Sequence, residues 1–183
     1  MFKNQLIEKC LANDRKAQMQ LYNKYCEGMF LVANRFLKNT QEAEDAMQEG
    51  FISAFLKLKQ FEGEVSFGAW LKRIVINKCL DKLKAKKLNY VALNESVLAK
   101  VEDERDESWE VDEDVNVQEV TRVIENLPEK YKYPLMLFLM EGYDHEEISE
   151  ILGITQVASR TLIHRGKKKL LEELKVYTNG TGA

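Results

Sequence analysis

The stretch from Tyr143 to Leu170 limits the possible folds most, because it contains start and stop signals for two helices joined by a short turn. Asp144 followed by Glu147 is a capping box, which predicts a helix that begins directly after Asp144. Gly153 is suited to end that helix, and Thr155 is suited to cap a second, longer one. We therefore expect a helical hairpin with a glycine turn.

The second of these helices has an apolar side and a basic side. One stripe carries Ser159, Ile163, Gly166 and Leu170, and the opposite side carries Val157, Ala158, Thr161, His164, Arg165 and Lys168. Between Thr155 and Lys169 the chain has five basic residues and no acid. The pattern favours a helix-turn-helix whose second helix enters a DNA major groove. The alternative is an ordinary hairpin whose lysines only solvate it.

Composition narrows the class of protein. The chain has 183 residues, of which 45% are hydrophobic and 31% are charged, as in globular proteins of one or two domains. No run approaches the roughly 18 consecutive apolar residues of a membrane span, and the N-terminus lacks a secretory signal. Three scattered cysteines favour reduced thiols, and two histidines without a CxxC pair make a zinc site improbable. We expect a cytoplasmic protein with no cofactor and no membrane insertion.

Charge divides the chain into segments. From Asn94 to Glu119 there are eleven acids and two bases, a net charge of −9, so the remainder carries +6 against the overall −3. Segregated basic residues are compatible with nucleic-acid binding. Only two prolines occur and no β-type alternation is sustained, which predicts an all-α fold. We expect two small helical domains over residues 1–88 and 117–176, an acidic linker over 89–116, and a disordered tail over 177–183.

The helix expected over residues 39–58 has two unlike faces. Its cap is the box formed by Asn39 and Glu42. The core stripe consists of Ala43, Met47, Phe51, Ala54 and Leu58, and the opposite face carries Asp45, Gln48, Glu49, Ile52 and Leu56. Acids mixed with exposed aliphatic residues suit a partner protein with a basic, partly apolar surface. Equally compatible is a face on which Ile52 and Leu56 pack against another helix of the same domain.

A loop over residues 59–66 precedes a basic helix over residues 67–87. Gly63 supplies the turn and Ser66 the cap. The core side of this helix holds Phe67, Trp70, Leu71 and Ile74, and a polar stripe beside it holds Arg73, Asn77 and Asp81. Seven bases and one acid between Ser66 and Tyr90 suit a nucleic-acid surface, although Trp70 itself is better explained as a core residue.

Two more helices are expected over residues 117–142. Pro128 belongs to the first turn of the second of these helices, and Pro134 should kink or loosen it. The predicted core residues here are Leu135, Leu137, Phe138, Leu139 and Met140.

Taken in order, these segments resemble a bacterial sigma factor of the extracytoplasmic-function group of the sigma-70 family. The resemblance covers about residues 5–175 and rests on EAEDAMQEGFISAF, FGAWLKRIVINKCLDKLKAKK, and LPEKYKYPLMLFLMEGYDHEEISEILGI followed by SRTLIHRGKKKL. It implies a dissociable subunit that binds core RNA polymerase, through the β′ clamp and β subunits, and promoter DNA. It also implies an anti-sigma factor as a partner, and we expect a monomer when the protein is free.

The resemblance assigns roles to individual residues. Polymerase binding is implied for Asp45, Gln48, Glu49 and Ile52. Reading and opening of the −10 element is implied for Phe61, Glu62, Gly63, Glu64, Arg73, Asn77 and Lys78, with the loop from Phe61 to Ser66 capturing a flipped base. Contact with the −35 element is implied for Arg160, Thr161, His164, Arg165 and Lys168. Departures from the family pattern are Ser159, Leu162 and Gly166.

Two other functions fit parts of the sequence. A free-standing helix-turn-helix regulator would bind promoters strongly without polymerase, but it leaves the outward acidic helix unexplained. An enzyme with a metal site on the acids of residues 102–114 is disfavoured, because those acids lack an ordered scaffold and no nucleophile or paired base accompanies them. We therefore expect a specificity subunit without catalytic chemistry of its own.

Overall fold

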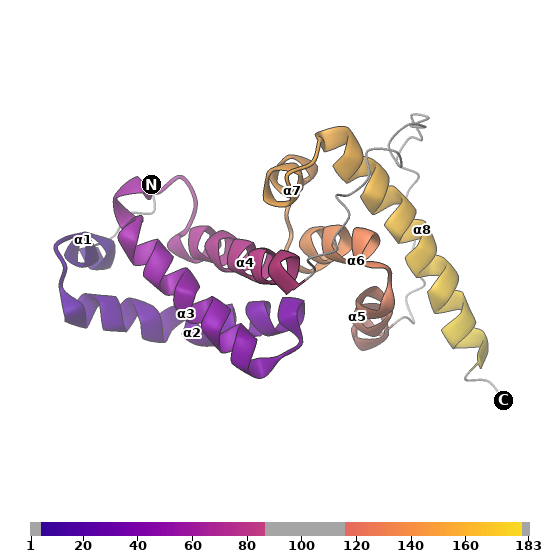
Figure 1. The fold of residues 1–183 in the computed structure, drawn as a ribbon, viewed down its shortest axis with the longest axis horizontal. Coiled ribbons are helices and arrows are strands. Elements are labelled where there is room, and N and C mark those ends of the chain that lie inside the picture. Colours follow the sequence, from indigo (N-terminus) through magenta and orange to yellow (C-terminus); the bar gives the residue numbers. More distant parts are fainter. Residues whose placement is uncertain (1–4, 87–115, 181–183) are drawn as a thin grey trace. The chain divides into compact units, whose positions relative to one another are not determined.

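The computed structural model describes residues 5–86 and 116–180, in two compact units that are considered separately below. The first unit spans Met1–Tyr90 and the second spans Val91–Ala183. Helices and turns account for the regular structure of the described residues, which confirms the all-α prediction (Figure 1). Most of the predicted acidic linker, including the acids of residues 102–114, lies outside the described residues.

The described part of the first unit contains four α-helices, of which the last two occur where the sequence predicts them. They are α1 (Gln5–Leu11), α2 (Arg15–Leu37), α3 (Thr40–Leu56) and α4 (Phe67–Lys86), with a 3-10 turn η1 (Leu58–Gln60) after α3. The Asp14 carboxylate caps α2 by accepting hydrogen bonds from two backbone N–H groups. Lys38, at a left-handed φ of 54°, ends α2 and turns the chain toward α3.

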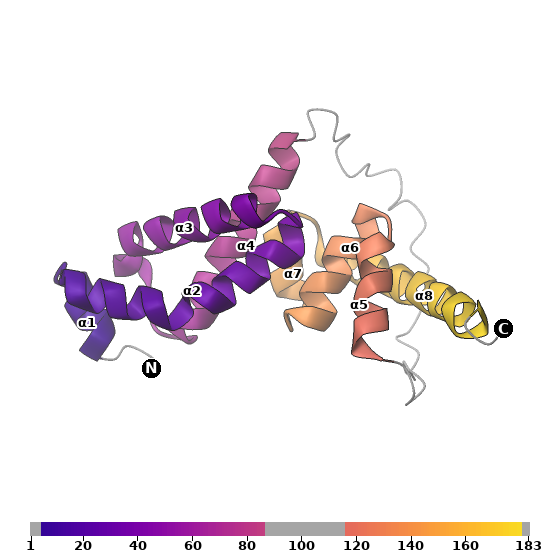
Figure 2. The ribbon, with the colours of Figure 1, turned by 90° about the horizontal axis from the view of Figure 1, so that it is seen from below.

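The core of the first unit lies where α2, α3 and α4 pack against one another (Figures 1 and 2). Every residue of the predicted α3 core stripe is buried: Ala43, Met47, Phe51, Ala54 and Leu58. At Gly50 the two helices α3 and α4 approach so closely that an added Cβ would lie 2.5 Å from Val75 Cγ2. The predicted stripe is therefore confirmed, and a glycine permits the close crossing.

The second unit contains α5 (Val117–Asn126), α6 (Glu129–Leu135), a π-helical turn η3 (Met136–Met140), α7 (His145–Leu152) and α8 (Gln156–Gly180). The three shorter helices α5, α6 and α7 all pack against α8 (Figures 1 and 2). The α8 helix continues to Gly180, beyond residue 176, so residues 177–180 are helical where we expected a disordered tail. A helix that has already begun extends at little cost per residue.

The two prolines act at different points of this unit. Pro128 is the residue before α6 rather than part of its first turn. Pro134 lies inside α6 and is directly followed by Leu135 and the wider π turn, in which the Glu141 N–H donates to the Met136 carbonyl at 3.1 Å. Because a proline weakens the helix on its N-terminal side, where α6 is continuous, the π turn does not test the loosening expected from Pro134. Leu139 was predicted to be core, but it lies in the π turn and is 38% exposed, whereas Met136 and Leu137 of the same turn are buried.

The helical hairpin forms as its capping signals predict. The Asp144 carboxylate accepts from the Glu147 N–H at 2.8 Å, and the Glu147 carboxylate accepts from the Asp144 N–H at 3.0 Å. Gly153 ends α7 at a left-handed φ of 68°. Thr155 Oγ1 then accepts from the Ala158 N–H at 3.1 Å and caps α8. These bonds confirm the two helices and the turn between them.

Candidate protein and nucleic-acid interfaces

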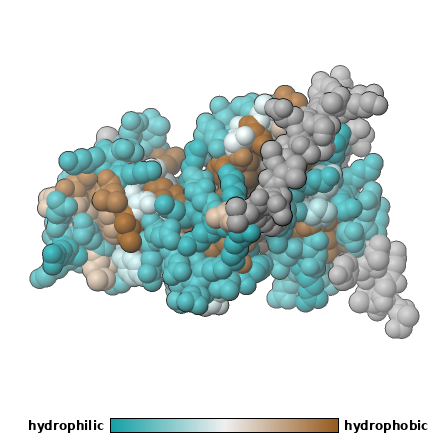
Figure 3. Space-filling view, viewed as in Figure 1, coloured by the Kyte–Doolittle hydropathy of each residue, from teal (hydrophilic) through white to brown (hydrophobic). Residues whose placement is uncertain are grey.

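The outward face of α3 is open to a partner. Ile52 is 60% exposed and Leu56 is 81% exposed, so the alternative in which they pack inside their own domain is wrong. Asp45, Gln48 and Glu49 share this exposed face. In the space-filling view, hydrophobic atoms reach the surface of the first unit in the region of α3 (Figure 3). We call Asp45, Gln48, Glu49, Ile52 and Leu56 the α3 face.

Two ion pairs join α3 to the C-terminal half of α4. Lys82 Nζ donates to Glu49 Oε1 at 2.8 Å, and Lys86 Nζ donates to Glu42 Oε2 at 2.6 Å. The bond to Glu49 raises the pKa of Lys82, the nearby charges of Glu49, Asp45 and Glu42 add to this rise, and partial burial opposes it. Sequence reasoning missed both pairs, because their partners are far apart in the chain.

The predicted cap of α3 is only partly as expected. Asn39 Oδ1 accepts from the Glu42 N–H at 3.0 Å, which is the first half of a capping box. The Glu42 carboxylate instead accepts from Lys86 on α4, so it joins two helices of the unit.

The polar stripe of α4 is partly open. Asn77 and Asp81 are exposed, whereas Arg73 and Lys78 are half-buried. Trp70 is half-buried, with its ring centroid 5.3 Å from that of Phe61 and 5.8 Å from that of Phe67. Trp70 therefore packs against two core rings but is not fully buried, so its interpretation as a core residue holds only in part.

The loop between η1 and α4 divides into buried and exposed positions. Phe61 is only 1% exposed, so its ring belongs to the core and fixes the base of the loop. Gly63 is buried at a φ of 81°, a conformation that favours glycine. Glu62, Glu64 and Ser66 are exposed, and Ser66 Oγ accepts from the Ala69 N–H at the start of α4. Only the exposed positions offer side chains to a ligand here.

The first turns of α8 present a mixed outward surface. Val157, Arg160 and Lys168 are exposed, and Thr161, His164 and Arg165 are half-buried. Ala158, which we placed on this side, is instead 1% exposed, and Leu162 is 5% exposed. Because α6 and α7 both pack on α8, its buried side is wider than a single stripe. Lys167 Nζ lies 4.7 Å from the centre of the Phe138 ring, which directs it toward η3.

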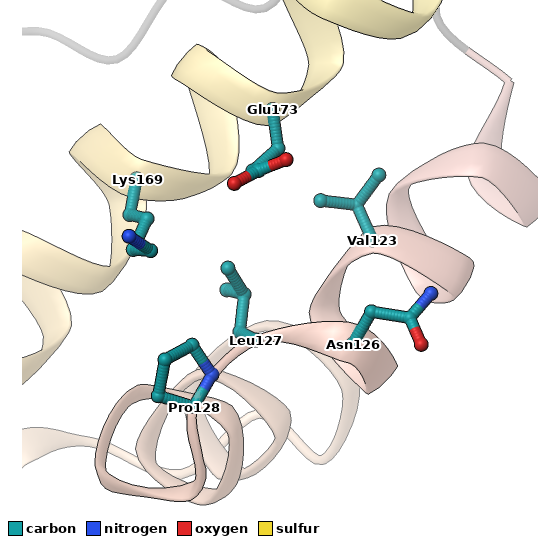
Figure 4. Close-up of a pocket in the computed structure, with 6 residues that line it drawn as sticks. All are labelled: Val123, Asn126, Leu127, Pro128, Lys169 and Glu173. Atoms are coloured by element: carbon teal, nitrogen blue, oxygen red, sulfur yellow. The ribbon is translucent and has the colours of Figure 1, made fainter.

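Small-molecule and metal sites are not evident in the described chain. A hollow of about 90 Å³ lies between α8 and the junction of α5 with α6 (Figure 4). It is lined by Val123, Asn126, Leu127, Pro128, Lys169 and Glu173. Ligand pockets usually enclose roughly 300–1,000 Å³, so this hollow is too small for most metabolites. The described residues include no cluster of three metal-ligating side chains, and none of their helices has the length and apolar character to cross a membrane.

Comparison with known families decides among the candidate functions. The model of sigma-70 region 2 matches residues 21–88, and the model of sigma-70 region 4 matches residues 117–170. Together they cover more than half of the chain, one model in each unit. The chain belongs to the sigma-70 family. The region 2 match includes the α3 face and α4 of this sigma factor, and the region 4 match includes its helix-turn-helix.

Relatives place this sigma factor in the extracytoplasmic-function (ECF) group. It is 29% identical over 177 residues to ECF RNA polymerase sigma factor SigW of Bacillus subtilis, covering 92% of this chain and 95% of that protein. It is 26% identical over 176 residues to ECF RNA polymerase sigma factor SigM of Mycobacterium tuberculosis, covering 96% and 86%.

Solved structures show the same fold. CnrH, solved in complex with the cytosolic domain of CnrY, matches with a TM-score of 0.56 and 19% identity over 93% of this chain and 96% of that chain. RpoE of Bartonella quintana, solved with the anti-sigma factor NepR, matches with a TM-score of 0.57 and 19% identity over 86% and 96%.

Proposed function

We propose that this sigma factor binds core RNA polymerase through the α3 face and directs it to promoters by reading their −35 and −10 elements. The observation that carries the proposal is the composition of the α3 face, where Ile52 and Leu56 are exposed beside two acids and a glutamine. Exposed aliphatic side chains within a charged rim are typical of a protein interface. The relatives SigW and SigM are both named RNA polymerase sigma factors, which supports polymerase as the occupant.

The second unit contacts the −35 element in this proposal. The basic side of α8 has the charge to neutralise phosphates, and its N-terminal turns are placed to meet base edges in the major groove. Arg160 is exposed there, so it is available for a two-bond contact with guanine. Such a contact discriminates against a wrong base by about 1–3 kcal/mol. Thr161, His164, Arg165 and Lys168 contribute neighbouring contacts to bases or phosphates.

The first unit contacts the −10 element. Arg73, Asn77 and Lys78 on α4 meet the opening duplex, and the exposed residues of the loop from Phe61 to Ser66 receive an unpaired base. Extruding a base costs a few kcal/mol, which contacts between the loop and the base must offset. The buried Phe61 and the left-handed Gly63 hold the loop in shape for this task rather than touching the base.

The remaining parts of the proposal concern organisation and partners. Residues 1–88 form the polymerase-binding and −10 domain, residues 117–176 form the −35 domain, and the acidic residues 89–116 connect them. The protein works in the cytoplasm, without catalytic chemistry or a cofactor of its own. An anti-sigma factor is a further partner, because the structurally similar RpoE was solved in complex with one.

Co-elution with purified core polymerase at moderate salt tests the polymerase contact. The wild type should co-elute, and Asp45→Lys should weaken binding without unfolding the chain, because Asp45 is exposed. Glu27→Lys makes the same charge reversal at an exposed site on α2 and should bind normally. Equal affinity of wild type and Asp45→Lys would refute the α3 face. Failure of the wild type to co-elute, with DNA binding retained, would support a free-standing regulator instead.

A promoter library read by the reconstituted holoenzyme tests the −35 contact. Arg160→Ala should relax preference at one −35 position, whereas Arg122→Ala, at an exposed site on α5, should leave every preference intact. An unchanged −35 profile for Arg160→Ala would remove Arg160 from the reading surface.

A further inference from the structure

An apolar residue stands at the front of the basic face of α8. Val157 is 51% exposed, although it lies within the first turn after the cap at Thr155. The next two residues, Ala158 and Ser159, are 1% and 0% exposed. Since those two residues fix the buried side of the helix, the rotation of α8 holds Val157 outward. A single exposed valine is ordinary in a protein, so its surroundings must decide whether it has a role.

Thr161 is the neighbour of Val157 on the same face, one helical turn along. Its Oγ1 donates to the Val157 carbonyl at 2.9 Å, so the hydroxyl hydrogen is bonded within the helix. What this pair offers to a partner is therefore mainly methyl surface. Arg160, exposed between them in sequence, provides a charged contact at the edge of the methyl surface.

The major groove of DNA contains one matching apolar group. Thymine presents its 5-methyl group there, whereas the other three bases present only hydrogen-bonding edges. The N-terminal residues of a recognition helix are those that contact base edges. Arg160, Arg165 and Lys168 lie on this face, and no acid occurs between Thr155 and Lys169, so the face is complementary to the phosphates on either side of the groove.

We infer that Val157, with the methyl group of Thr161 beside it, recognises the 5-methyl group of a thymine in the −35 element. The inference rests on the proposed function, because it names the base that the same face of α8 reads. It makes Val157 a specificity-determining residue, and it predicts that the preferred −35 element contains at least one thymine selected for its methyl group rather than for its hydrogen bonds.

Replacing thymine with deoxyuridine removes only this methyl group and keeps the base pair. The −35 element is first selected from a randomised duplex library with the holoenzyme reconstituted from core polymerase and the full chain. Each selected thymine, on either strand, is then replaced in turn with deoxyuridine, and the Kd of the holoenzyme for each modified duplex is measured. At one or two positions the loss of the methyl contact should weaken binding about fourfold.

Val157→Ala should abolish this discrimination, so that thymine and deoxyuridine bind with nearly equal Kd at the same position. Val117→Ala is the matched control, because Val117 is 78% exposed on α5 of the same unit, and it should keep the fourfold ratio. Both variants alter exposed side chains and should fold normally, which circular dichroism checks.

Two results would overturn the inference while leaving the sigma role in place. One is a selected −35 element with no position at which the wild type distinguishes thymine from deoxyuridine. The other is a Val157→Ala holoenzyme that retains the full ratio between its Kd for the deoxyuridine duplex and its Kd for the thymine duplex. A holoenzyme with no sequence preference at the −35 element would instead refute the proposed −35 contact by α8, and this inference with it.

Discussion

Lys82 Nζ on α4 lies 2.8 Å from Glu49 Oε1 on α3, so one carboxylate of the α3 face already has a cation from its own chain. The side chains are 27% and 48% exposed, respectively, and pairs that are this accessible contribute about 0.2–1 kcal/mol. The free protein therefore presents the α3 face with part of its negative charge neutralised. A basic partner must share Glu49 with Lys82 or displace it.

Lys82→Gln should strengthen binding to core polymerase by about 1.5-fold to fivefold, because it removes the competing cation. Competition with labelled wild-type protein for a limited amount of core polymerase measures the change in affinity. Lys84→Gln, at an exposed site on the same helix, is the control for general charge effects and should change affinity less. Weaker binding of Lys82→Gln would mean that Lys82 positions Glu49 for the polymerase instead of competing for it.

Gly50→Ala should destabilise the first unit by about 1–3 kcal/mol, because its Cβ would lie 2.5 Å from Val75 Cγ2 and 3.4 Å from Val75 Cα. Gly28→Ala is the matched control, since nothing lies within 4 Å of a Cβ at that position of α2. It should stabilise the unit by up to about 1 kcal/mol through helix propensity. Urea unfolding followed by Trp70 fluorescence, in a Trp109→Phe background, compares them. The two changes in the free energy of unfolding should have opposite signs. A Gly50→Ala variant that is more stable than the wild type would contradict the close crossing of α3 and α4.

Ser159→Ala should stabilise the second unit by about 1 kcal/mol. The Ser159 hydroxyl is buried, and it has no hydrogen-bond partner within the described part of the chain. Alanine removes the cost of burying that hydroxyl while keeping the backbone helical. Thermal unfolding of the variant and the wild type, monitored by circular dichroism, measures the gain. A lower stability would show that the hydroxyl makes a bond worth more than its desolvation.

Cys26 should be the first thiol to react in the native protein. Burial raises the pKa of Cys79 to about 12, and burial together with the charge of Asp14 raises that of Cys10. Cys26 is half-buried, whereas the other two are buried. Iodoacetamide at pH 8 followed by peptide mass mapping should therefore label Cys26 well before Cys10 and Cys79. Rapid native labelling of Cys79 would contradict its burial.

The same shift predicts how stability depends on pH. The folded-state pKa of Cys79 is above its ordinary value of 9.0, so the neutral thiol contributes fully below pH 9. That contribution is lost as pH rises from 9.0 toward about 12, where only the unfolded chain has released the proton. Urea unfolding at pH 8 and pH 10.5 should show a shallower decline for Cys79→Ala than for the wild type. An equal decline in stability between the two pH values for both proteins would show that Cys79 does not contribute to the pH dependence.

Helix positions and caps were predictable from the sequence because they depend on residues close together in the chain. Asp144 and Glu147 form their box within one turn, and Gly153 ends its helix through its own φ angle. The composition of the α3 face was predictable for the same reason, since a helical period alone brings Asp45 and Glu49 to one side. The sequence by itself therefore determined the all-α fold, the hairpin and the candidate partner face.

Only the tertiary structure decided which of these faces stay open. Spacing left Ile52 and Leu56 equally compatible with packing or exposure, and it placed Ala158 on the wrong side of α8, because burial depends on where other helices cross. The Lys82–Glu49 pair and the Gly50–Val75 approach likewise require two helices to meet in one particular register. Such contacts join residues far apart in the chain, and no local period or cap encodes the crossing that brings them together.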